Sequence, residues 1–284
     1  MTRLAKHQAV FAFLMTVSLL IGWRPLIDAF TLAWGHDEYT QILLIIPISA
    51  SLIFLERQPL RRMIILNVRF SVILLAIAVL IGCATIGSLA VLPSDAQLSV
   101  RILALVLWWI GSFVCCFGLR AARAVSFPLC FLFGLVPCPQ LLLNPIVAAL
   151  QQGSAWTAYL LFAAFGVPVA ENGVVLTIPG LTLQVAQECS SIRSSSMLLV
   201  TTMVLAQLLL RSSWRKALVI CLAIPLSVAK NGLRIFTIAM LGTRVDPGYL
   251  TGPFHHQGGI VFFAVALISI FAFLWVLRRS EDLS

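Results

Sequence analysis

The sequence predicts an all-α polytopic membrane protein with about eight transmembrane helices, an outer interfacial helix and a small extracytoplasmic β-hairpin. Of the 284 residues, 61% are hydrophobic and only 10% are charged, whereas soluble domains carry roughly 25% charged residues. The apolar stretches are continuous and about 20 residues long, which suits spanning helices rather than the short alternating strands of a membrane barrel. The basic residues that give the net charge of +9 punctuate these stretches instead of forming one patch, so nucleic acid is not expected as a partner.

Nine apolar stretches are candidates for crossing the membrane. The first follows a basic N-terminus and resembles a signal peptide, but no small-residue cleavage site comes after it, so we expect a retained helix. In chain order the stretches cover residues 8–23, 40–55, 70–92, 102–118, 121–137, 143–165, 190–210, 216–236 and 259–277.

The distribution of Lys and Arg decides which stretches cross. If 143–165 stays on the outer side and the other eight cross, both termini and thirteen of the nineteen basic residues lie in the cytoplasm. Pro137, Pro139 and Pro145 at the start of this stretch also disfavour a straight span. We therefore expect one integral membrane domain covering residues 1–284, with eight spans and an interfacial or re-entrant helix at 143–165.

Between residues 166 and 188 the pattern changes from helical to extended. Asn172-Gly173 separates two β-prone runs, which predicts a hairpin, and Pro179-Gly180 predicts a second turn. By the topology above, this small β-element is extracytoplasmic and leads directly into Cys189.

Three polar clusters interrupt the apolar pattern in the last third of the chain, at residues 188–193, 230–234 and 254–259. Ionisable side chains at the edge of lipid are costly and are therefore candidates for a functional site. The predicted topology places all three clusters at the outer face. Together they supply a thiol, guanidinium groups and imidazoles, which is the inventory of a thiol transferase or protease.

Cys189 is the candidate nucleophile. We expect it near a helix N-terminus, where the helix dipole favours the thiolate, and Arg193 one turn later favours it too. Two alternatives stay open, a structural disulfide with Cys138 and an inert packed thiol. The other five cysteines lie within apolar stretches and are expected to be small buried hydrophobes.

Arg234, His255 and His256 are the other candidates for chemistry. Arg234 shares a helix face with Asn231, so its guanidinium is suited to holding a carboxylate or an oxyanion; the alternative is an Arg that snorkels to the headgroups. Histidine is the usual proton carrier near neutral pH. Two adjacent histidines and one distant thiol have no zinc-site spacing, so neither a metal nor another cofactor is expected.

The three clusters resemble the motifs of the exosortase/archaeosortase family of polytopic membrane transpeptidases. Cys189–Arg193 is similar to the family's Cys-Ser-Gly/Ser-x-Arg run, and Asn231–Arg234 to its Asn-x-x-Arg motif. His255, with Gly259 four residues later, is similar to its last motif, and a histidine there is typical of the bacterial branch. The likeness covers most of residues 125–265, with two departures: Ser191 replaces a commoner Gly, and Tyr39–Ile42 replaces Tyr-Ser-His-Gly in the first outer loop.

The resemblance implies a cysteine protease or transpeptidase of the bacterial inner (plasma) membrane. Its relatives cleave C-terminal sorting signals, which combine a short motif such as Pro-Glu-Pro, a transmembrane helix and a basic tail. The new C-terminus passes to an acceptor, either a lipid or a polysaccharide. In this mechanism Cys189 attacks the peptide carbonyl, Arg234 stabilises the oxyanion and His255 protonates the leaving amine. The expected supporting or substrate-binding residues are Arg193, Asn231, Ser190 and His256.

Two other functional classes compete with this interpretation. A non-enzymatic membrane component of exopolysaccharide export or assembly would need only an intact fold. A transporter would usually place its polar residues near the middle of the membrane, whereas the predicted topology places them at one face. Membrane lipids are expected partners in every case.

Overall fold

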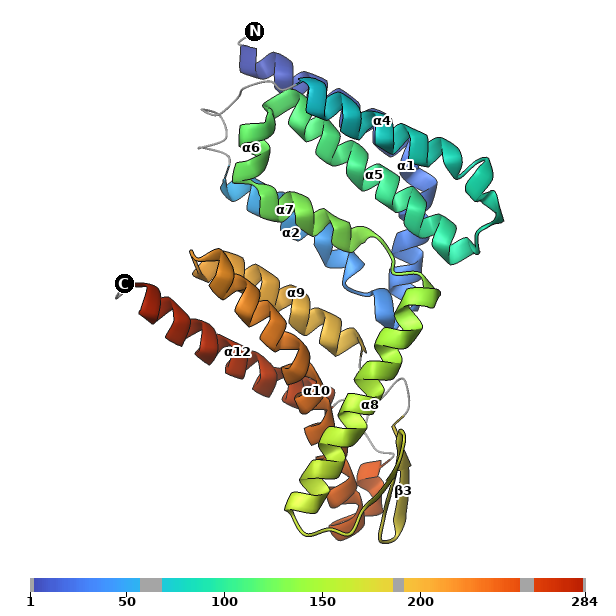
Figure 1. Cartoon of the computed structure of the whole chain (residues 1–284), viewed down its shortest axis with the longest axis vertical. Coiled ribbons are helices and arrows are strands. Elements are labelled where there is room, and N and C mark those ends of the chain that lie inside the picture. Colours follow the sequence, from blue (N-terminus) through green and yellow to red (C-terminus); the bar gives the residue numbers. More distant parts are fainter. Residues whose placement is uncertain (1–2, 57–67, 186–191, 251–257, 283–284) are drawn as a thin grey trace. The chain divides into compact units, whose positions relative to one another are not determined.

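The structure is a computed structural model that describes residues 3–56, 68–185, 192–250 and 258–282 (Figure 1). The chain divides into two compact units, Met1–Leu142 and Leu143–Ser284, which are described separately below as unit 1 and unit 2. Helices dominate both units, and the sheet is small. The all-α polytopic fold class is confirmed, while the single membrane domain stays a prediction.

Six helical segments in the described ranges are long and apolar enough to cross a membrane. A seventh candidate is a bent pair, Ser126–Leu135 with Gln140–Ala164, whose two helices meet at 98°. The break between them carries Pro137 and Pro139, so the prolines interrupt the helix where the sequence predicted. The number of eight spans and the outer position of 143–165 stay predictions. The six segments are Lys6–Gly35, Asp37–Leu55, Ser94–Phe117, Ile192–Leu209, Ser213–Arg244 and Gly259–Asp282.

Unit 1 is a group of helices around α5 (Ser94–Phe117), which packs against both α1 (Arg3–Gly35) and α4 (Val68–Ala84). Its remaining helices are α2 (Ile42–Leu55), α6 (Leu119–Ala124) and α7 (Ser126–Phe131). Short 3-10 turns connect them at Asp37–Tyr39, Ser88–Val91 and Leu132–Leu135.

Hydrogen bonds from two tryptophans fasten α5 to α1. The indole N–H of Trp109 donates to Ser18 Oγ at 2.9 Å, and that of Trp108 donates to the carbonyl of Leu14 at 3.2 Å. Further along the same contact, the ring of Phe11 lies edge-on to Phe113 at a centroid distance of 6.0 Å. Both indole donors are thereby satisfied in an apolar environment, where an unpaired N–H is costly.

Three side chains of unit 1 hold the Pro-Cys-Pro segment that precedes α8. The hydroxyl of Tyr39 donates to the carbonyl of Cys138 at 2.8 Å, and Ser99 Oγ lies 2.7 Å from the carbonyl oxygen of Pro137. The carboxylate of Asp95 accepts the backbone N–H of Gln140 at 2.9 Å. These contacts satisfy backbone groups that the proline break leaves without helical partners.

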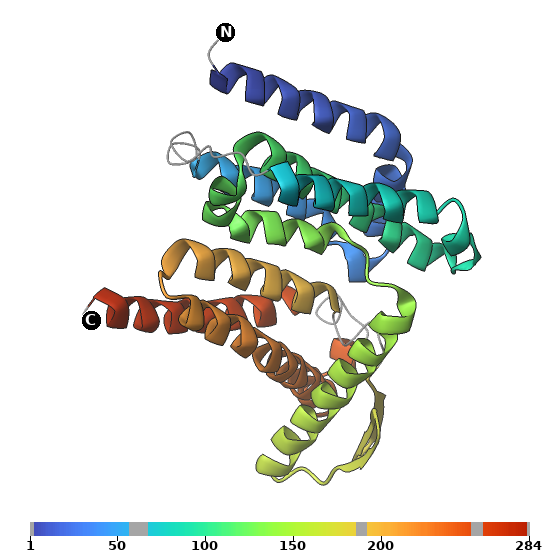
Figure 2. The same cartoon turned by 45° about the horizontal axis from the view of Figure 1, so that its top comes forward.

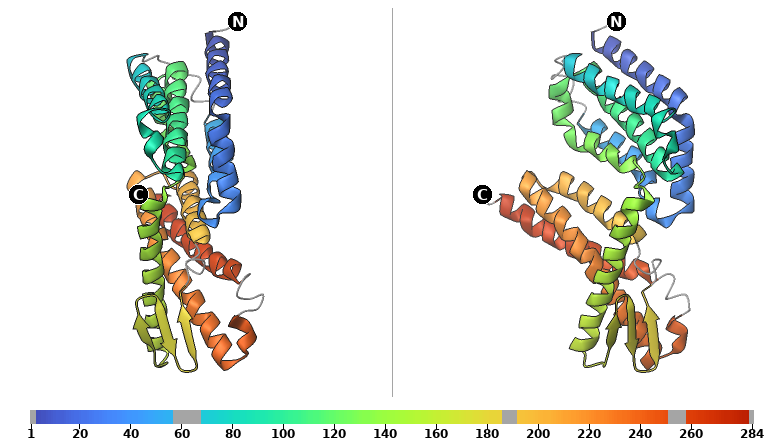
Figure 3. Two further views of the ribbon diagram at one scale, coloured as in Figure 1. Left: turned by 90° about the vertical axis from the view of Figure 1, so that its right-hand side faces the viewer. Right: turned by 45° about the vertical axis from the view of Figure 1, so that its right-hand side comes forward.

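Unit 2 begins with nearly all of α8 (Gln140–Ala164), followed by an antiparallel sheet of β1 (Ala170–Asn172), β2 (Val175–Ile178) and β3 (Leu181–Gln184) (Figure 3). The strands are joined at Gly173 and Gly180, whose φ angles of 62° and 82° favour glycine. Both predicted turns are confirmed, and the second adds a third strand to the predicted hairpin. The rest of unit 2 is α9 (Ile192–Leu209), α10 (Ser213–Arg244), the 3-10 turn Pro247–Leu250 and α12 (Gly259–Asp282).

Two apolar cores share α10. α9, α10 and α12 lie side by side (Figure 2). The first core lies between them and includes Leu198, Val219 and Ile270. The second packs the later part of α10, at Phe236, against Phe162 of α8 and the sheet. At 1.5 Å per residue the 18 residues of α9 span about 27 Å, close to the thickness of a bilayer core. The first core therefore has the length of a membrane-spanning bundle, and α10 continues beyond it.

One end of this three-helix bundle is basic and is tied together by Glu281. Its carboxylate accepts the backbone N–H groups of Arg211 and Ser212, each at 2.9 Å, at the turn between α9 and α10. The guanidinium of Arg215 donates to the carbonyl of Leu277 at 2.9 Å. This group is called the basic end below; its cationic residues are Arg211, Arg215, Lys216, Arg278 and Arg279.

Candidate active site

The described parts of the three polar clusters meet at the end of the three-helix bundle that is opposite the basic end. Arg193 stands in the first turn of α9, Arg234 lies on α10, and Gly259 begins α12. α9 and α12 both start at this level, while α10 passes through it on the way to the second core. The site therefore forms where the bundle joins the part of unit 2 built from α8 and the sheet.

The first turn of α9 is bound to α10 through polar contacts. Ser227 Oγ donates to Ser195 Oγ at 2.6 Å, and the ammonium group of Lys230 donates to Ser194 Oγ. Ser227 and Lys230 are three residues apart and share a face of α10. Lys230 is only 6% exposed, so its amino group is held inside the protein and does not reach the surface. These contacts fix the start of α9, and Cys189 is three residues before that start.

The contact between α10 and α12 joins the second cluster to the third. The guanidinium of Arg234 lies so close to Gly259 that a Cβ placed there would be 3.9 Å from both Cζ and Nη1. This is ordinary van der Waals distance, so an alanine would fit, but a longer side chain would compete with the guanidinium for space. A small residue at position 259 therefore lets Arg234 lie over the beginning of α12.

Gly232 brings α10 against α8. A Cβ at this position would lie 2.5 Å from Cβ of Thr157 and 3.1 Å from the backbone nitrogen of Ala158. No side chain fits there without movement of the helix backbone, so glycine is required by the close approach. Asn231, directly beside it, is buried with 1% exposure. The helix crossing thus sets the positions of both polar residues of the Asn-Gly-Leu-Arg run.

Several predicted site residues lie outside the described ranges. Arg193 is described and exposed, and Arg234 and Asn231 are described and lie at the junction. Cys138, the alternative disulfide partner of Cys189, is a free and partly buried thiol. The predicted site residues outside these ranges are Cys189, Ser190, His255 and His256.

The other cysteines differ in part from the prediction. Cys116 is buried, as expected, but Cys83, Cys130 and Cys221 are exposed. The prediction of buried cysteines is wrong for these three, because an apolar stretch in a membrane helix has one face for the protein and another for lipid. In the described part of the chain, no group of three or more His, Cys, Asp and Glu side chains is arranged to hold a metal ion.

Lys230 belongs to the second predicted polar cluster, but Ser194 and Ser195, which connect α9 to α10, were not predicted as site residues. A signal was present in the serine run 194–196, which opens an otherwise apolar helix, and in the position of Lys230 directly before Asn231. Residue types alone did not show that these groups face one another, because the pairing depends on how the two helices are rotated.

Comparison with known proteins gives one family. Residues 33–272 match the model of the family described as transmembrane exosortase (Exosortase_EpsH). No curated protein and no solved structure matches the chain. The matched range includes all three polar clusters, and membership suggests a membrane-embedded transpeptidase, generally one that uses cysteine. With its six candidate spans and its match over most of its length, this chain is a multi-span membrane protein that belongs to the transmembrane exosortase family.

Proposed function

We propose that this protein is a membrane-embedded cysteine protease or transpeptidase that cleaves C-terminal sorting signals at the outer face of the bacterial inner membrane. The observation that carries the proposal is the meeting of the three motif-bearing segments at one end of the bundle. Arg234 lies against Gly259, and Lys230 donates to Ser194. Segments far apart in sequence thus supply their polar groups to one place, as a catalytic site requires.

Chain connectivity supports roles for Cys189 and His255 at this place. Cys189 is three residues before Ile192, and His255 is four residues before Gly259. An extended chain covers at most about 3.6 Å per residue, so the two Cα atoms are held within roughly 11 Å and 14 Å of the starts of α9 and α12. Both helix starts adjoin the part of α10 that carries Arg234.

In the proposed mechanism the thiolate of Cys189 attacks the carbonyl carbon of the scissile peptide and forms a C–S bond. Arg234 stabilises the negative charge on the carbonyl oxygen in the tetrahedral intermediate. The intermediate collapses to a thioester as the C–N bond breaks, and His255 gives a proton to the leaving amine. His255 then takes a proton from the acceptor nucleophile or from water, which attacks the thioester; the C–S bond breaks and Cys189 is released as the thiolate. Arg193, Asn231, Ser190 and His256 have supporting or substrate-binding roles.

The charges at the basic end of unit 2 support the placement of the site at the outer face. Cytoplasmic loops of membrane proteins carry an excess of Lys and Arg. The basic end satisfies that rule and also carries Trp214 and Trp275, both more than half exposed, as interfacial residues often are. The candidate site lies one bundle length away, about 27 Å at 1.5 Å per residue of α9. A site there acts on a substrate after its delivery across the membrane.

A transporter is the weaker alternative, because the described polar contacts lie at an end of the bundle instead of midway along it.

Replacing the nucleophile distinguishes the proposed enzyme from a non-enzymatic component of exopolysaccharide assembly, which would need only an intact fold. Cells that carry a reporter protein with a C-terminal sorting signal would be compared by the size of the reporter. We expect Cys189→Ala to abolish cleavage. Cys221→Ala, which alters an exposed thiol on α10 nearer the basic end, is the matched control and should cleave normally. Full processing by Cys189→Ala would rule out the mechanism.

A further inference from the structure

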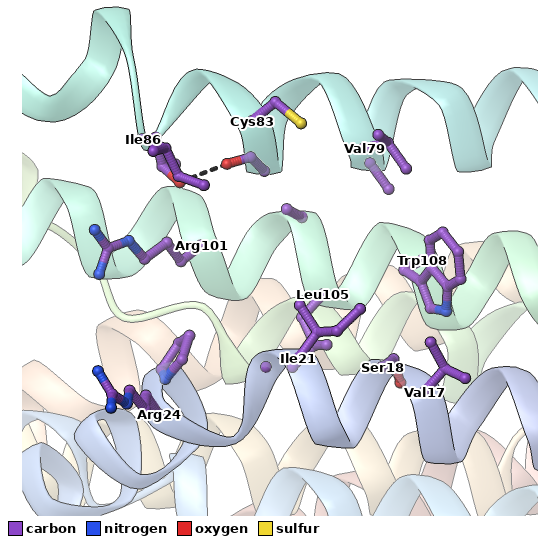
Figure 4. Close-up of a pocket in the computed structure, with 16 residues that line it drawn as sticks. Val17, Ser18, Ile21, Arg24, Val79, Cys83, Ile86, Arg101, Leu105 and Trp108 are labelled. Carbon is purple, nitrogen blue, oxygen red and sulfur yellow. Dashed lines mark hydrogen bonds between the residues drawn. The ribbon is translucent and has the colours of Figure 1, made fainter.

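Unit 1 contains an apolar groove of about 500 Å³ between α1, α4 and α5, with two arginines at one end (Figure 4). Its walls are formed by residues such as Val17, Val79 and Trp108. Arg24 of α1 and Arg101 of α5 lie at the same end of this groove, as the close-up shows. This space is called the arginine groove below. It is separate from the candidate active site, which is built entirely from unit 2.

The wall of the arginine groove offers little besides hydrocarbon, because its polar groups are already paired. The hydroxyl of Ser18 donates to the carbonyl of Met15 at 2.7 Å, and that of Thr85 donates to the carbonyl of Gly82 at 2.7 Å. The indole N–H of Trp108 is also used, by the carbonyl of Leu14. A ligand along this wall would therefore make apolar contacts only.

The two guanidinium groups, in contrast, have most of their donors available. Arg101 makes one hydrogen bond, of 3.3 Å, to the amide oxygen of Gln97, and the guanidinium of Arg24 lies 5.5 Å from the ring of its neighbour Trp23. Within the described ranges neither arginine is in an ion pair. The nearby carboxylates of Asp28 and Asp95 line an adjoining cavity that Arg101 also borders. No carboxylate lines the arginine groove itself, so this end of it is positive.

The dimensions fit one leaflet of a bilayer. Arg24 and Val17 are seven residues apart on α1, as are Arg101 and Trp108 on α5. Seven residues of helix rise about 10 Å, roughly a third of the 30 Å hydrocarbon core. In the predicted topology Arg24 directly follows the apolar stretch 8–23 and Arg101 directly precedes the stretch 102–118, so both lie at the outer boundary of these stretches. A positive end with an apolar wall below it is complementary to an anionic lipid whose headgroup lies at the outer surface.

We infer that the arginine groove binds an anionic phospholipid of the outer leaflet. The phosphate accepts hydrogen bonds from Arg24 and Arg101, and the upper part of the acyl chains lies along α1, α4 and α5. The inference does not depend on the proposed catalytic chemistry, because no residue of the candidate active site takes part in it.

The test measures lipid binding by the purified full-length protein, with phosphatidylglycerol and phosphatidylcholine of the same acyl chains compared by native mass spectrometry. One variant, Arg24→Gln with Arg101→Gln, removes the charges, and the two single variants accompany it. A second, Gly82→Leu, fills the groove: a Cβ at Gly82 meets nothing within 4 Å, and leucine is a better helix former. The matched control is Arg244→Gln, which removes an exposed charge from unit 2.

We expect the wild type and Arg244→Gln to prefer phosphatidylglycerol, and the double arginine variant to lose at least about tenfold in that preference, since a hydrogen bond to a charged group is worth that factor. Gly82→Leu should lose binding of both lipids at this site. An unchanged preference in the double arginine variant would overturn the inference, as would undiminished binding of both lipids by Gly82→Leu or an equal loss of preference in Arg244→Gln. Displacement of the lipid by glycerol phosphate at equal concentration would also overturn it, because the chains would then add nothing. Thermal unfolding verifies that each variant is folded. If the double arginine variant is unfolded, the two single arginine variants are compared with the wild type in its place.

Discussion

The guanidinium of Arg234 lies against the backbone of Gly259, with Cζ 3.9 Å from the place that a Cβ of residue 259 would occupy. This contact joins the Asn-Gly-Leu-Arg run of α10 to the start of α12, directly after the segment that carries His255. A residue proposed to stabilise an oxyanion thus lies beside the helix that follows the proposed proton donor. A small residue at position 259 leaves room for this arrangement.

Enlarging residue 259 should therefore lower activity without unfolding the protein. In Gly259→Ala the added Cβ is at ordinary van der Waals distance from Arg234, so near-normal reporter cleavage is expected. In Gly259→Leu the larger side chain displaces the guanidinium, and we expect a loss approaching the roughly 100-fold that follows removal of one oxyanion donor. Cleavage rates and thermal unfolding would be measured together. Equal rates for the leucine and alanine variants would show that the position of Arg234 is unimportant.

Replacing Arg234 should affect the chemical step more than substrate binding. Arg234→Gln removes the charge, and we expect kcat for a sorting-signal peptide to fall by about 100-fold to 1000-fold, with a smaller change in KM. Arg234→Lys keeps a charge but not the planar fork, so it should recover only part of the rate. The matched control is Arg244→Gln, ten residues further along α10, which we expect to be fully active. A change confined to KM would assign Arg234 to substrate binding instead.

Gly232 should tolerate no side chain, because α8 and α10 are in contact there. Gly232→Ala places a Cβ 2.5 Å from that of Thr157, and we expect a destabilisation of about 1–3 kcal/mol from overpacking. Gly82→Ala is the control: it is also a helical glycine, but its Cβ meets nothing within 4 Å, so it should be neutral or stabilising by up to about 1 kcal/mol. Unfolding in detergent measures both. Similar stability of the two variants would contradict the close packing.

Ser18 should matter for the contact between α1 and α5. Ser18→Ala leaves the buried indole N–H of Trp109 without its acceptor, which costs about 1–3 kcal/mol. Thr16→Ala, two residues earlier, removes an exposed hydroxyl that bonds only within its own helix, so little change is expected. Thermal unfolding followed by tryptophan fluorescence distinguishes the two. An unaltered unfolding temperature in Ser18→Ala would show that this bond does not stabilise unit 1.

The fold class could be predicted from the sequence because a bilayer requires long apolar helices, and the pattern of the chain shows them directly. The turns at Gly173 and Gly180 and the break at Pro137 and Pro139 were also predictable, since each depends on the backbone chemistry of one or two residues. The residues at which the helices end were less predictable. α1 continues through Pro25 to Gly35, beyond the predicted end at residue 23, as membrane helices can accommodate an internal proline.

The later part of α10 shows why the site could be predicted only in part. The apolar stretch was expected to end at residue 236, but the helix runs to Arg244 because Phe236 and Ala239 pack against α8 and the sheet. Long-range packing of this kind leaves no local signal. For the same reason the motif residue Arg234 was predicted as a candidate, while its contact with Gly259 and the bond between Lys230 and Ser194 were not.

The most direct test of the central claim is the labelling of Cys189 in intact cells by a membrane-impermeant maleimide, with the other six cysteines replaced. An activated nucleophile at the outer face predicts rapid labelling from outside that is already fast at pH 7, where an ordinary thiol with a pKa near 8.5 reacts slowly. Labelling only after the membrane has been permeabilised would place Cys189 on the cytoplasmic side and contradict both the topology and the proposed function.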